Sequence, residues 1–120
     1  MKAILIHEFG DESVLRYEEV PGPQPGSREV LVRVKAASLN RGDLARRAGT
    51  YGGGGEPLPF TPGWEVAGVV EAVGSEVRER TPGQRLLAQS PAGGYAEQDF
   101  VSEATRYHGR LWQAKEGGGA

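Results

Sequence analysis

Glycine and proline interrupt this chain so often that long regular elements are excluded over most of its length. The 120 residues contain 19 glycines and 8 prolines, and only 38% of the residues are hydrophobic. Proline fixes φ and lacks the backbone N–H donor, while glycine favours turns. A chain of this size supports one domain with one modest core. The composition therefore favours a single domain of short strands joined by irregular loops over a helical bundle.

Between these breaks, hydrophobic and polar residues alternate with the period of two that is typical of β-strands. The clearest case is residues 29–36, in which Val30, Val32 and Val34 share one face. One buried face opposite a partly solvated face fits an antiparallel sheet. The spacing of such segments predicts a mainly β fold, either a barrel or a sandwich. The other expected strands are residues 2–7, 14–20, 66–73, 84–89 and 94–101.

Residues 40–48 change from the strand period to a helical one, and we expect one short helix there. Asn40 is a good N-cap, and Asp43 places a carboxylate near the exposed N–H groups of the first turn. Arg46 and Arg47 lie towards the C-terminal end, where positive charge is favoured. The segment after this helix, up to residue 63, is dense in glycine and proline and predicts an irregular loop.

Charge and composition exclude several classes of function. A net charge of −2 gives no electrostatic reason to expect nucleic acid or an anionic membrane as a partner. The chain has no cysteine, which excludes disulfides, thiolate catalysis and Cys-based metal sites. Charges and glycines interrupt every hydrophobic run before it reaches the length of a membrane span or a signal sequence. The sequence therefore predicts a cytoplasmic protein without a membrane or nucleic-acid partner.

Residues 59–74 carry the most specific motif, P-F-T-P-G-W-E-V-A-G-V-V-E-A-V-G. This stretch resembles a signature of the medium-chain dehydrogenase/reductase superfamily, in which a loop ending in P-G-x-E leads into a strand reading A-G-V-V. Other segments resemble the same superfamily in the same order, although Gln84 replaces the aspartate usual in P-G-D-R. These segments are M-K-A-I at 1–4, E-V-L-V-R-V at 29–34, L-N-R-G-D at 39–43, P-G-Q-R at 82–85 and G-G-Y-A-E at 93–97.

Residues 1–101 thus resemble the N-terminal part of a zeta-crystallin-like quinone oxidoreductase. That resemblance implies a GroES-like, partly open β-barrel with one or two short helices. In the family, this domain covers the substrate and the nicotinamide beside a separate Rossmann domain.

Two positions place the chain with the zinc-free members of the superfamily. Zinc-dependent relatives have a histidine ligand at the position of Trp64, whose indole N–H has no lone pair for a metal. They have a cysteine ligand at the position of Asn40, whose amide cannot supply a thiolate. The resemblance therefore implies a protein with no zinc, and we assign no metal ligands.

The same resemblance suggests three cofactor-cleft residues: Asn40, Asp43 and Tyr51. Asn40 matches an asparagine near the nicotinamide end of the cofactor; the alternative, which the helix pattern favours, is that it only caps the helix, and one side chain can serve in both roles. Asp43 is either a cleft residue or simply a charge at the helix N-terminus. Tyr51 matches a tyrosine beside the nicotinamide or substrate. We expect Trp64 to pack in the cleft wall, and we assign no catalytic residue.

The cofactor domain of the family is missing from the sequence. Quinone reduction in this family uses NADPH, held by a Rossmann unit with a glycine-rich turn. The sequence has no G-x-G-x-x-G, and residues 102–120 are fewer than the roughly 30 that one βαβ unit needs. The resemblance therefore implies a truncated quinone oxidoreductase-related chain that does not bind NADPH and is inactive alone, or that works with a separate Rossmann-domain chain.

Residues 102–120 do not match the family and show no period of 2 or 3.6. Our hypothesis is that a frameshift near Val101 replaced the original continuation.

An incomplete barrel exposes strand edges, so we expect a homodimer in which Leu111 and Trp112 pack against the second copy. Whether the chain is an enzyme stays open at this stage. The alternative to the oxidoreductase fragment is a small non-enzymatic β-barrel with a binding or scaffolding role.

Overall fold

The structure, a computed structural model, describes residues 1–53 and 55–104. Most of residues 102–120, including Leu111 and Trp112, lie outside the described residues, so the expectations for this segment stay predictions. None of the helices in the described ranges has the length and hydrophobicity to span a bilayer.

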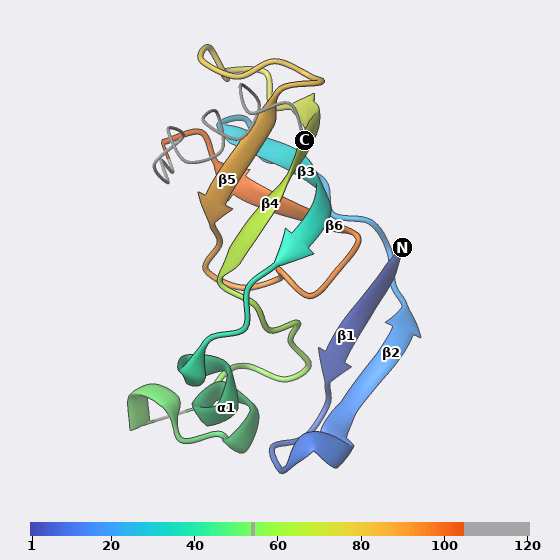
Figure 1. The fold of residues 1–120 in the computed structure, drawn as a ribbon, viewed down its shortest axis with the longest axis vertical. Helices are drawn as coiled ribbons and strands as arrows, with labels where there is room; N and C mark the ends of the chain where they lie inside the picture. Colours follow the sequence, from blue (N-terminus) through green and yellow to red (C-terminus); the bar gives the residue numbers. More distant parts are fainter. Residues whose placement is uncertain (54, 105–120) are drawn as a thin grey trace, which may run out of the picture.

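The strand β3 (Glu29–Ala37) is the centre of a four-stranded antiparallel sheet with the order β5-β4-β3-β6 (Figure 1). Its alternating valines confirm the predicted strand, because Val30 and Val32 are buried on one face. The pairing of β3 with β4 is irregular at two places, where Glu71 is an extra residue of β4 and Lys35 an extra residue of β3. Such bulges bend the strands that contain them. The other strands of this sheet are β4 (Glu65–Val73), β5 (Arg85–Gln89) and β6 (Gln98–Ser102).

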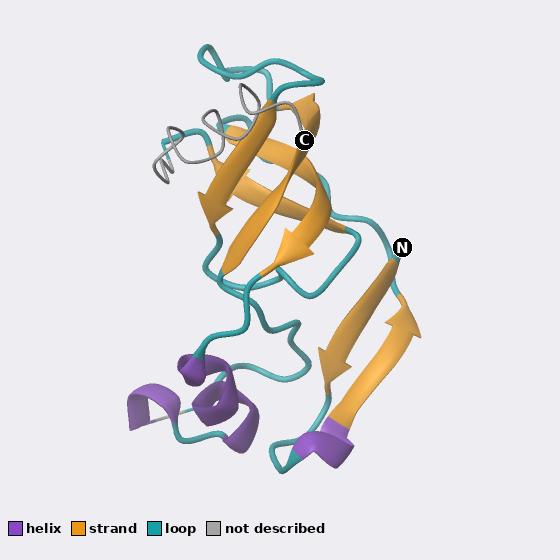
Figure 2. Cartoon of the chain, in the orientation of Figure 1, coloured by secondary structure: helices purple, strands orange, loops and turns teal. Residues whose placement is uncertain are grey.

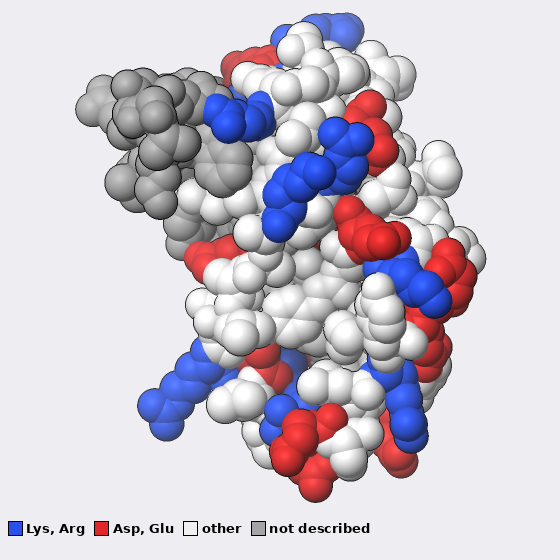
Figure 3. Space-filling view, turned by 45° about the vertical axis from the view of Figure 1, so that its right-hand side comes forward, with Lys and Arg blue, Asp and Glu red and all other residues white. Residues whose placement is uncertain are grey.

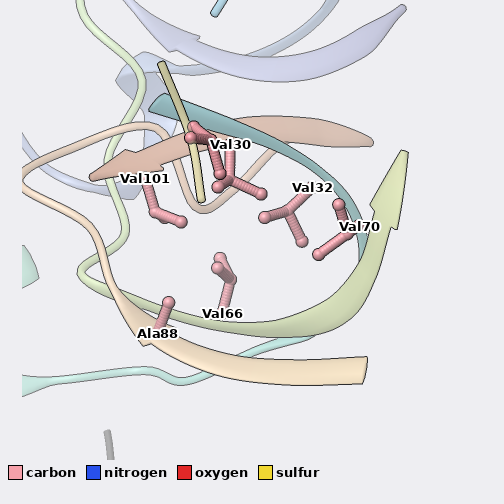
Figure 4. Close-up of a cluster of buried hydrophobic side chains, with 7 residues drawn as sticks. Val30, Val32, Val66, Val70, Ala88 and Val101 are labelled. Atoms are coloured by element: carbon pink, nitrogen blue, oxygen red, sulfur yellow. The ribbon is translucent and has the colours of Figure 1, made fainter. Parts of the chain in front are cut away.

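The core is a cluster of small aliphatic side chains on the concave side of this sheet. Figure 4 shows that they point towards one another from all four strands. Because valine packs well on a pleated surface and has a stiff χ1, a valine-rich core fits short, bent strands. The buried members are Val30, Val32, Val66, Val70, Val77, Ala88 and Val101.

Gly68, the glycine of the A-G-V-V motif, lets β4 lie close against β3. A Cβ at this position would lie 2.2 Å from the carbonyl oxygen of Arg33 and 2.8 Å from a methyl group of Val32. Both distances are too short for real contacts, so any side chain would push the two strands apart. The close packing of β3 and β4 therefore explains the glycine of this motif.

The N-terminal segment forms a separate two-stranded antiparallel ribbon of β1 (Lys2–Ile6) and β2 (Leu15–Glu19). Single bridges, Ala3 to Ala96 and Ile6 to Phe60, attach it to the rest of the chain. The ribbon and the sheet do not close into a complete barrel (Figures 1 and 2). This arrangement confirms the expected mainly β, partly open architecture.

Two of the predicted strands begin later than expected because their first residues make other contacts. The strand predicted at 94–101 begins only at Gln98, because the N–H groups of residues 93–95 donate to carbonyls of residues 61–63. The strand predicted at 14–20 begins at Leu15, because the preceding residues form the 3₁₀ turn η1 (Glu12–Val14). The Asp11 side chain caps this turn by accepting from the N–H of Ser13.

The predicted helix is present as α1 (Arg41–Ala48), with Asn40 at the N-cap. Gly49 ends it in the left-handed conformation, with φ of 79°. A short 3₁₀ turn, η2 (Tyr51–Gly53), follows in the segment predicted to be an irregular loop. In Figure 2, α1 and the ribbon lie at the same end of the molecule, below the four-stranded sheet.

We expect Gly68→Ala to lower the free energy of unfolding by about 1–3 kcal/mol, because overpacking forces two strands apart. Chemical denaturation monitored by circular dichroism measures this change. The matched control is Gly26→Ala, where a Cβ would meet only the flexible Glu29 side chain at 3.3 Å. Equal stability of the two variants would show that the close approach of β3 and β4 does not require glycine.

Candidate functional site

The helix α1 separates two hollows on the surface of the domain. The first, which we call the Trp64 hollow, has a volume of about 410 Å³ and is lined by Arg46, Tyr51, Glu56, Trp64, Gln89 and Ser90, with Pro91 at its edge. The second, which we call the Tyr95 hollow, is smaller, about 130 Å³, and its lining includes Leu39, Asp43, Leu44, Arg47 and Tyr95. Neighbouring residues of one helix turn therefore face different hollows.

Trp64 forms a wall of the first hollow and packs against the first turn of α1. A Cβ on Gly42 would lie 3.2 Å from its ring, so the indole lies directly against the helix backbone. The Tyr51 ring meets Trp64 edge-on at a centroid distance of 5.2 Å. The carbonyl of Trp64 accepts the N–H of Ser90 at 2.6 Å, which joins the wall to the end of β5. These contacts agree with the wall position expected for Trp64.

Arg46 is the most deeply buried charged side chain of this wall, with only 3% of its surface exposed. Its Nε donates to Glu56 Oε1 at 2.6 Å, forming an ion pair. The guanidinium carbon lies 5.3 Å from the Trp64 ring centroid and 5.7 Å from that of Phe60. Aromatic faces attract cations, so the two rings and the carboxylate together hold this charge away from water.

Asn40 lies at the junction of β3 and α1, where its side-chain amide is held in a polar cluster. Its Nδ2 donates to Ser38 Oγ at 2.9 Å and to Glu65 Oε2 at 3.3 Å. The Ser38 hydroxyl in turn donates to the same Glu65 oxygen at 2.6 Å. Glu65 therefore ties the motif strand β4 to the start of the helix.

Asp43 closes the first turn of α1 and is 8% exposed. Its Oδ2 accepts the backbone N–H of Asn40 at 2.9 Å, as expected for a carboxylate at a helix N-terminus. The same oxygen accepts the Tyr95 hydroxyl at 2.6 Å. Burial, followed by the hydrogen bond and charge of Asp43, raises the pKa of Tyr95 above its usual value. Tyr95 is therefore a fixed donor and not a source of protons near neutral pH.

The three predicted cleft residues lie in two places. Asn40 and Asp43 are joined directly by a hydrogen bond, and Asp43 faces the Tyr95 hollow. Tyr51 lies in the other hollow and contacts Trp64. The structure shows the capping contact of Asp43, but the cofactor roles of all three stay predictions.

Sequence reasoning missed three polar residues of this region: Arg46 and Asp99, which the fold buries, and Tyr95, which it half-buries. The position of Arg46 in the sequence indicates only a charge that is favourable at the end of a helix. Tyr95 stands out only as part of a segment that resembles the family, and Asp99 only as part of an alternating strand. A strand pattern with a carboxylate between Gln98 and Phe100 contains no signal for burial, which depends on the partner strand.

Asp99 lies in β6 and is 2% exposed. Burial raises its pKa to about 6, although hydrogen bonds from Ser90 and from the N–H of Phe100 oppose this shift. Oδ1 accepts the Phe100 N–H at 2.9 Å, while Oδ2 is buried without a hydrogen-bond partner among the described residues. A Cβ on Gly93 would lie 2.7 Å from Oδ1, so the chain closes tightly over this carboxyl group.

No group of three or more His, Cys, Asp or Glu side chains in residues 1–53 and 55–104 is arranged to hold a metal ion. Trp64 and Asn40, at the two positions where zinc-dependent relatives have ligands, contact Arg46 and Glu65 respectively. Absence of zinc stays a prediction from the identity of these residues.

Comparison with known proteins identifies the domain. Residues 26–118 match the alcohol dehydrogenase GroES-like domain. The chain belongs to this family. The match confirms the resemblance inferred from the P-G-W-E motif and the fold class expected with it.

Its relatives include quinone oxidoreductases of the medium-chain dehydrogenase/reductase superfamily. The quinone oxidoreductase of Lama guanicoe is 41% identical over 110 residues, which cover 89% of this chain and 33% of that protein. The crystal structure of the human synaptic vesicle membrane protein VAT-1 homolog-like protein has a TM-score of 0.85 at 33% identity, covering 89% of this chain and 34% of that one.

The Escherichia coli quinone oxidoreductase complexed with NADPH has a TM-score of 0.80 at 33% identity, covering 85% of this chain and 31% of that one. The present chain spans about a third of the length of the curated relatives that it matches.

We expect the buried Asp99 to make the domain less stable as pH rises. The folded-state pKa of about 6 exceeds the ordinary value of 3.8, so the folded state binds the proton more tightly. The contribution of Asp99 protonation to the free energy of unfolding is fully present below pH 3.8, decreases as pH rises and is lost above about pH 6. It amounts to roughly 2–3 kcal/mol. Denaturant unfolding of the wild type and Asp99→Asn between pH 4 and pH 7 measures it as a difference.

Asp99→Asn removes the ionisation and keeps a side chain of nearly the same size. We therefore expect this variant to gain stability relative to the wild type as pH increases. If the free energy of unfolding of the two proteins changes with pH in the same way, the pKa of Asp99 is not raised in the folded state.

Proposed function

We propose that this domain forms the substrate side of the active-site cleft of a zinc-free, NADPH-dependent quinone oxidoreductase. The observation that carries the proposal is the Trp64 hollow, which has aromatic walls and lies in a domain with the fold of the Escherichia coli quinone oxidoreductase complexed with NADPH. Flat aromatic substrates fit pockets that combine rings with a few oriented polar groups. Tyr51 and Trp64 provide the rings, and Arg46 provides the polar group.

The described residues do not fit a complete NADPH molecule. Helix N-termini bind phosphates through free N–H groups and a positive dipole end. The first turn of α1 instead carries the Asp43 carboxylate, which accepts the N–H of Asn40 and would repel a phosphate. In addition, β3 and β4 on either side of α1 are antiparallel, so β3-α1-β4 is not a Rossmann unit. NADPH, which supplies the hydride in quinone reduction, must therefore be bound mainly by another domain or chain.

In this proposal Asn40 and Tyr51 act only at the nicotinamide end of a cofactor bound elsewhere, and Asp43 contributes by accepting the backbone N–H of Asn40. The contacts of its Nδ2 with Ser38 and Glu65 support the proposed role of Asn40, because they hold its amide group in one orientation. The tryptophan and the asparagine at the former ligand positions support a reaction without zinc, because neither side chain provides a thiolate or an imidazole.

The 120-residue chain alone is expected to neither bind NADPH measurably nor reduce a quinone. The variant Trp112→Phe leaves Trp64 as the one tryptophan, because the sequence has only two. We expect no saturable quenching of its fluorescence by NADPH and no oxidation of NADPH in the presence of 1,4-naphthoquinone. Saturable quenching with turnover would instead identify a self-sufficient enzyme.

A chimera tests the cleft role directly. Residues 1–101 replace the corresponding segment of the Pseudomonas aeruginosa quinone oxidoreductase, which is 41% identical over 108 residues. We expect NADPH-dependent reduction of 1,4-naphthoquinone within about tenfold of the parent enzyme's kcat/KM. A folded chimera that binds NADPH but leaves the quinone unreduced would argue for a binding or scaffolding module.

We also propose that the chain associates as a homodimer. Both β5 and β6 are edge strands of the sheet, and several large hydrophobic side chains are exposed, including Leu39 at 84% and Tyr17 at 69%. Exposed edges and apolar surface favour association. The charges seen in Figure 3 are mixed in sign over the visible face and form no single-sign patch that would oppose it.

Sedimentation velocity at micromolar concentration is expected to give the mass of two chains. Replacing Leu39 by Lys should shift the distribution towards the single chain, because a charge on an apolar contact is costly to bury. As a control, Arg41→Lys changes an exposed residue of the same segment without changing its charge. A monomer for the unmodified chain contradicts the proposal.

A further inference from the structure

Two N–H donors in the wall of the Trp64 hollow have no acceptor. Arg46 Nη1 and Trp64 Nε1 are both buried without a hydrogen-bond partner among the described residues. Burying a donor without a partner costs roughly 1–3 kcal/mol, more for a charged group. Two such groups on adjacent side chains of one hollow are therefore unusual for a wall with only a structural role, and they suit a ligand with an exposed oxygen acceptor.

The orientation of Arg46 is fixed by contacts that leave Nη1 unpaired. Its Nε is bound to Glu56, and its plane lies near the rings of Phe60 and Trp64. The guanidinium remains charged at all relevant pH values. It is therefore a preorganised donor, whose position does not have to be ordered when a ligand arrives.

The charge of this wall favours an uncharged ligand. The Arg46 cation is paired with the Glu56 carboxylate at 2.6 Å, so the pair contributes no net charge to the hollow. A phosphate or carboxylate would bring a negative charge next to Glu56 and would have to be desolvated. A neutral carbonyl oxygen can accept both N–H groups without that cost, and a flat ring behind it can pack on Tyr51 and Trp64.

Both donor nitrogens are covered by neighbouring side chains, so an incoming oxygen must displace one of them. Tyr51 is a neighbour that can move, because 44% of its surface is exposed and its ring meets Trp64 edge-on. Gly52 and Gly53 follow it in left-handed conformations that glycine adopts readily.

We propose that Arg46 and Trp64 together bind one carbonyl oxygen of a flat, uncharged quinone-type acceptor through Arg46 Nη1 and Trp64 Nε1. This inference rests on the proposed function and deepens it, because it names the residues that recognise the acceptor and the ligand atom that they bind. Arg46 then selects carbonyl acceptors over anions of similar size.

Binding of 1,4-naphthoquinone to the full chain, measured by isothermal titration calorimetry and by the ¹H shift of the Trp64 indole N–H, tests the proposal. We expect saturable binding with a downfield shift of that proton. Arg46→Lys keeps the charge opposite Glu56 but removes the planar pair of nitrogens, and it should weaken binding at least about tenfold. Trp64→Phe keeps a ring without the donor and should weaken binding several-fold.

The matched control is Arg47→Lys, the same substitution one residue along α1. Arg47 faces the Tyr95 hollow and donates to the carbonyl of Gly10, so its variant should bind 1,4-naphthoquinone like the wild type. Circular dichroism of each variant establishes that it is folded. If Arg46→Lys does not fold, the Trp64→Phe variant and the indole proton shift still decide the outcome.

Inorganic phosphate and benzoate, titrated in parallel, should not displace the quinone or shift the indole proton. Binding of either anion at Trp64 in place of the quinone overturns the inferred acceptor class. The inferred contact is overturned if Arg46→Lys and Arg47→Lys weaken quinone binding equally, if neither variant weakens it, or if the quinone does not bind at all. The chimera's quinone turnover is independent of these titrations, so it shows separately whether the proposed function also fails.

Discussion

The pairing of β3 on both of its edges is the constraint on which the rest of the domain depends. β3 is bonded to β4 along one side and to β6 along the other, and its valines supply the middle of the core. Two irregularities, one on each strand, interrupt its pairing with β4, and Gly68 permits the two strands to lie in close contact. The end of β3 leads directly to Ser38 and Asn40, so the position of α1 follows from this pairing.

The helix that results buries charge where an ordinary surface helix buries hydrophobic side chains. Asp43 and Arg46 are its buried residues, whereas Leu44 is 56% exposed. Each buried charge is compensated from a different part of the chain: Tyr95 donates to Asp43, and Glu56 pairs with Arg46. Because buried charges are costly without such partners, α1 is held by specific polar contacts. Those contacts also form the walls of the two hollows.

Much of the framework follows from local sequence patterns. The alternation of Val30, Val32 and Val34 indicated β3, and the cap at Asn40 indicated where α1 begins, because both signals depend on neighbouring residues. The motif around Trp64 indicated the family and suggested Asn40, Asp43 and Tyr51. The late start of β6 was not predictable in this way, because the N–H groups of residues 93–95 bond to a loop thirty residues earlier in the chain. Local alternation contains no information about such distant acceptors.

The sequence by itself determined the order of most strands, the position of the helix, the family, and the absence of thiolate chemistry, because each depends on residue type and local order. Only the tertiary structure decided which polar groups are buried and which donors lack partners. Asp99 looks like any alternating strand residue until Gly93 closes over it, and Arg46 looks like a helix-end charge until Glu56 and Trp64 enclose it. Whether a side chain is buried depends on residues that the fold brings to it from distant parts of the chain. In the proposed cleft, burial decides which polar groups can bind a ligand.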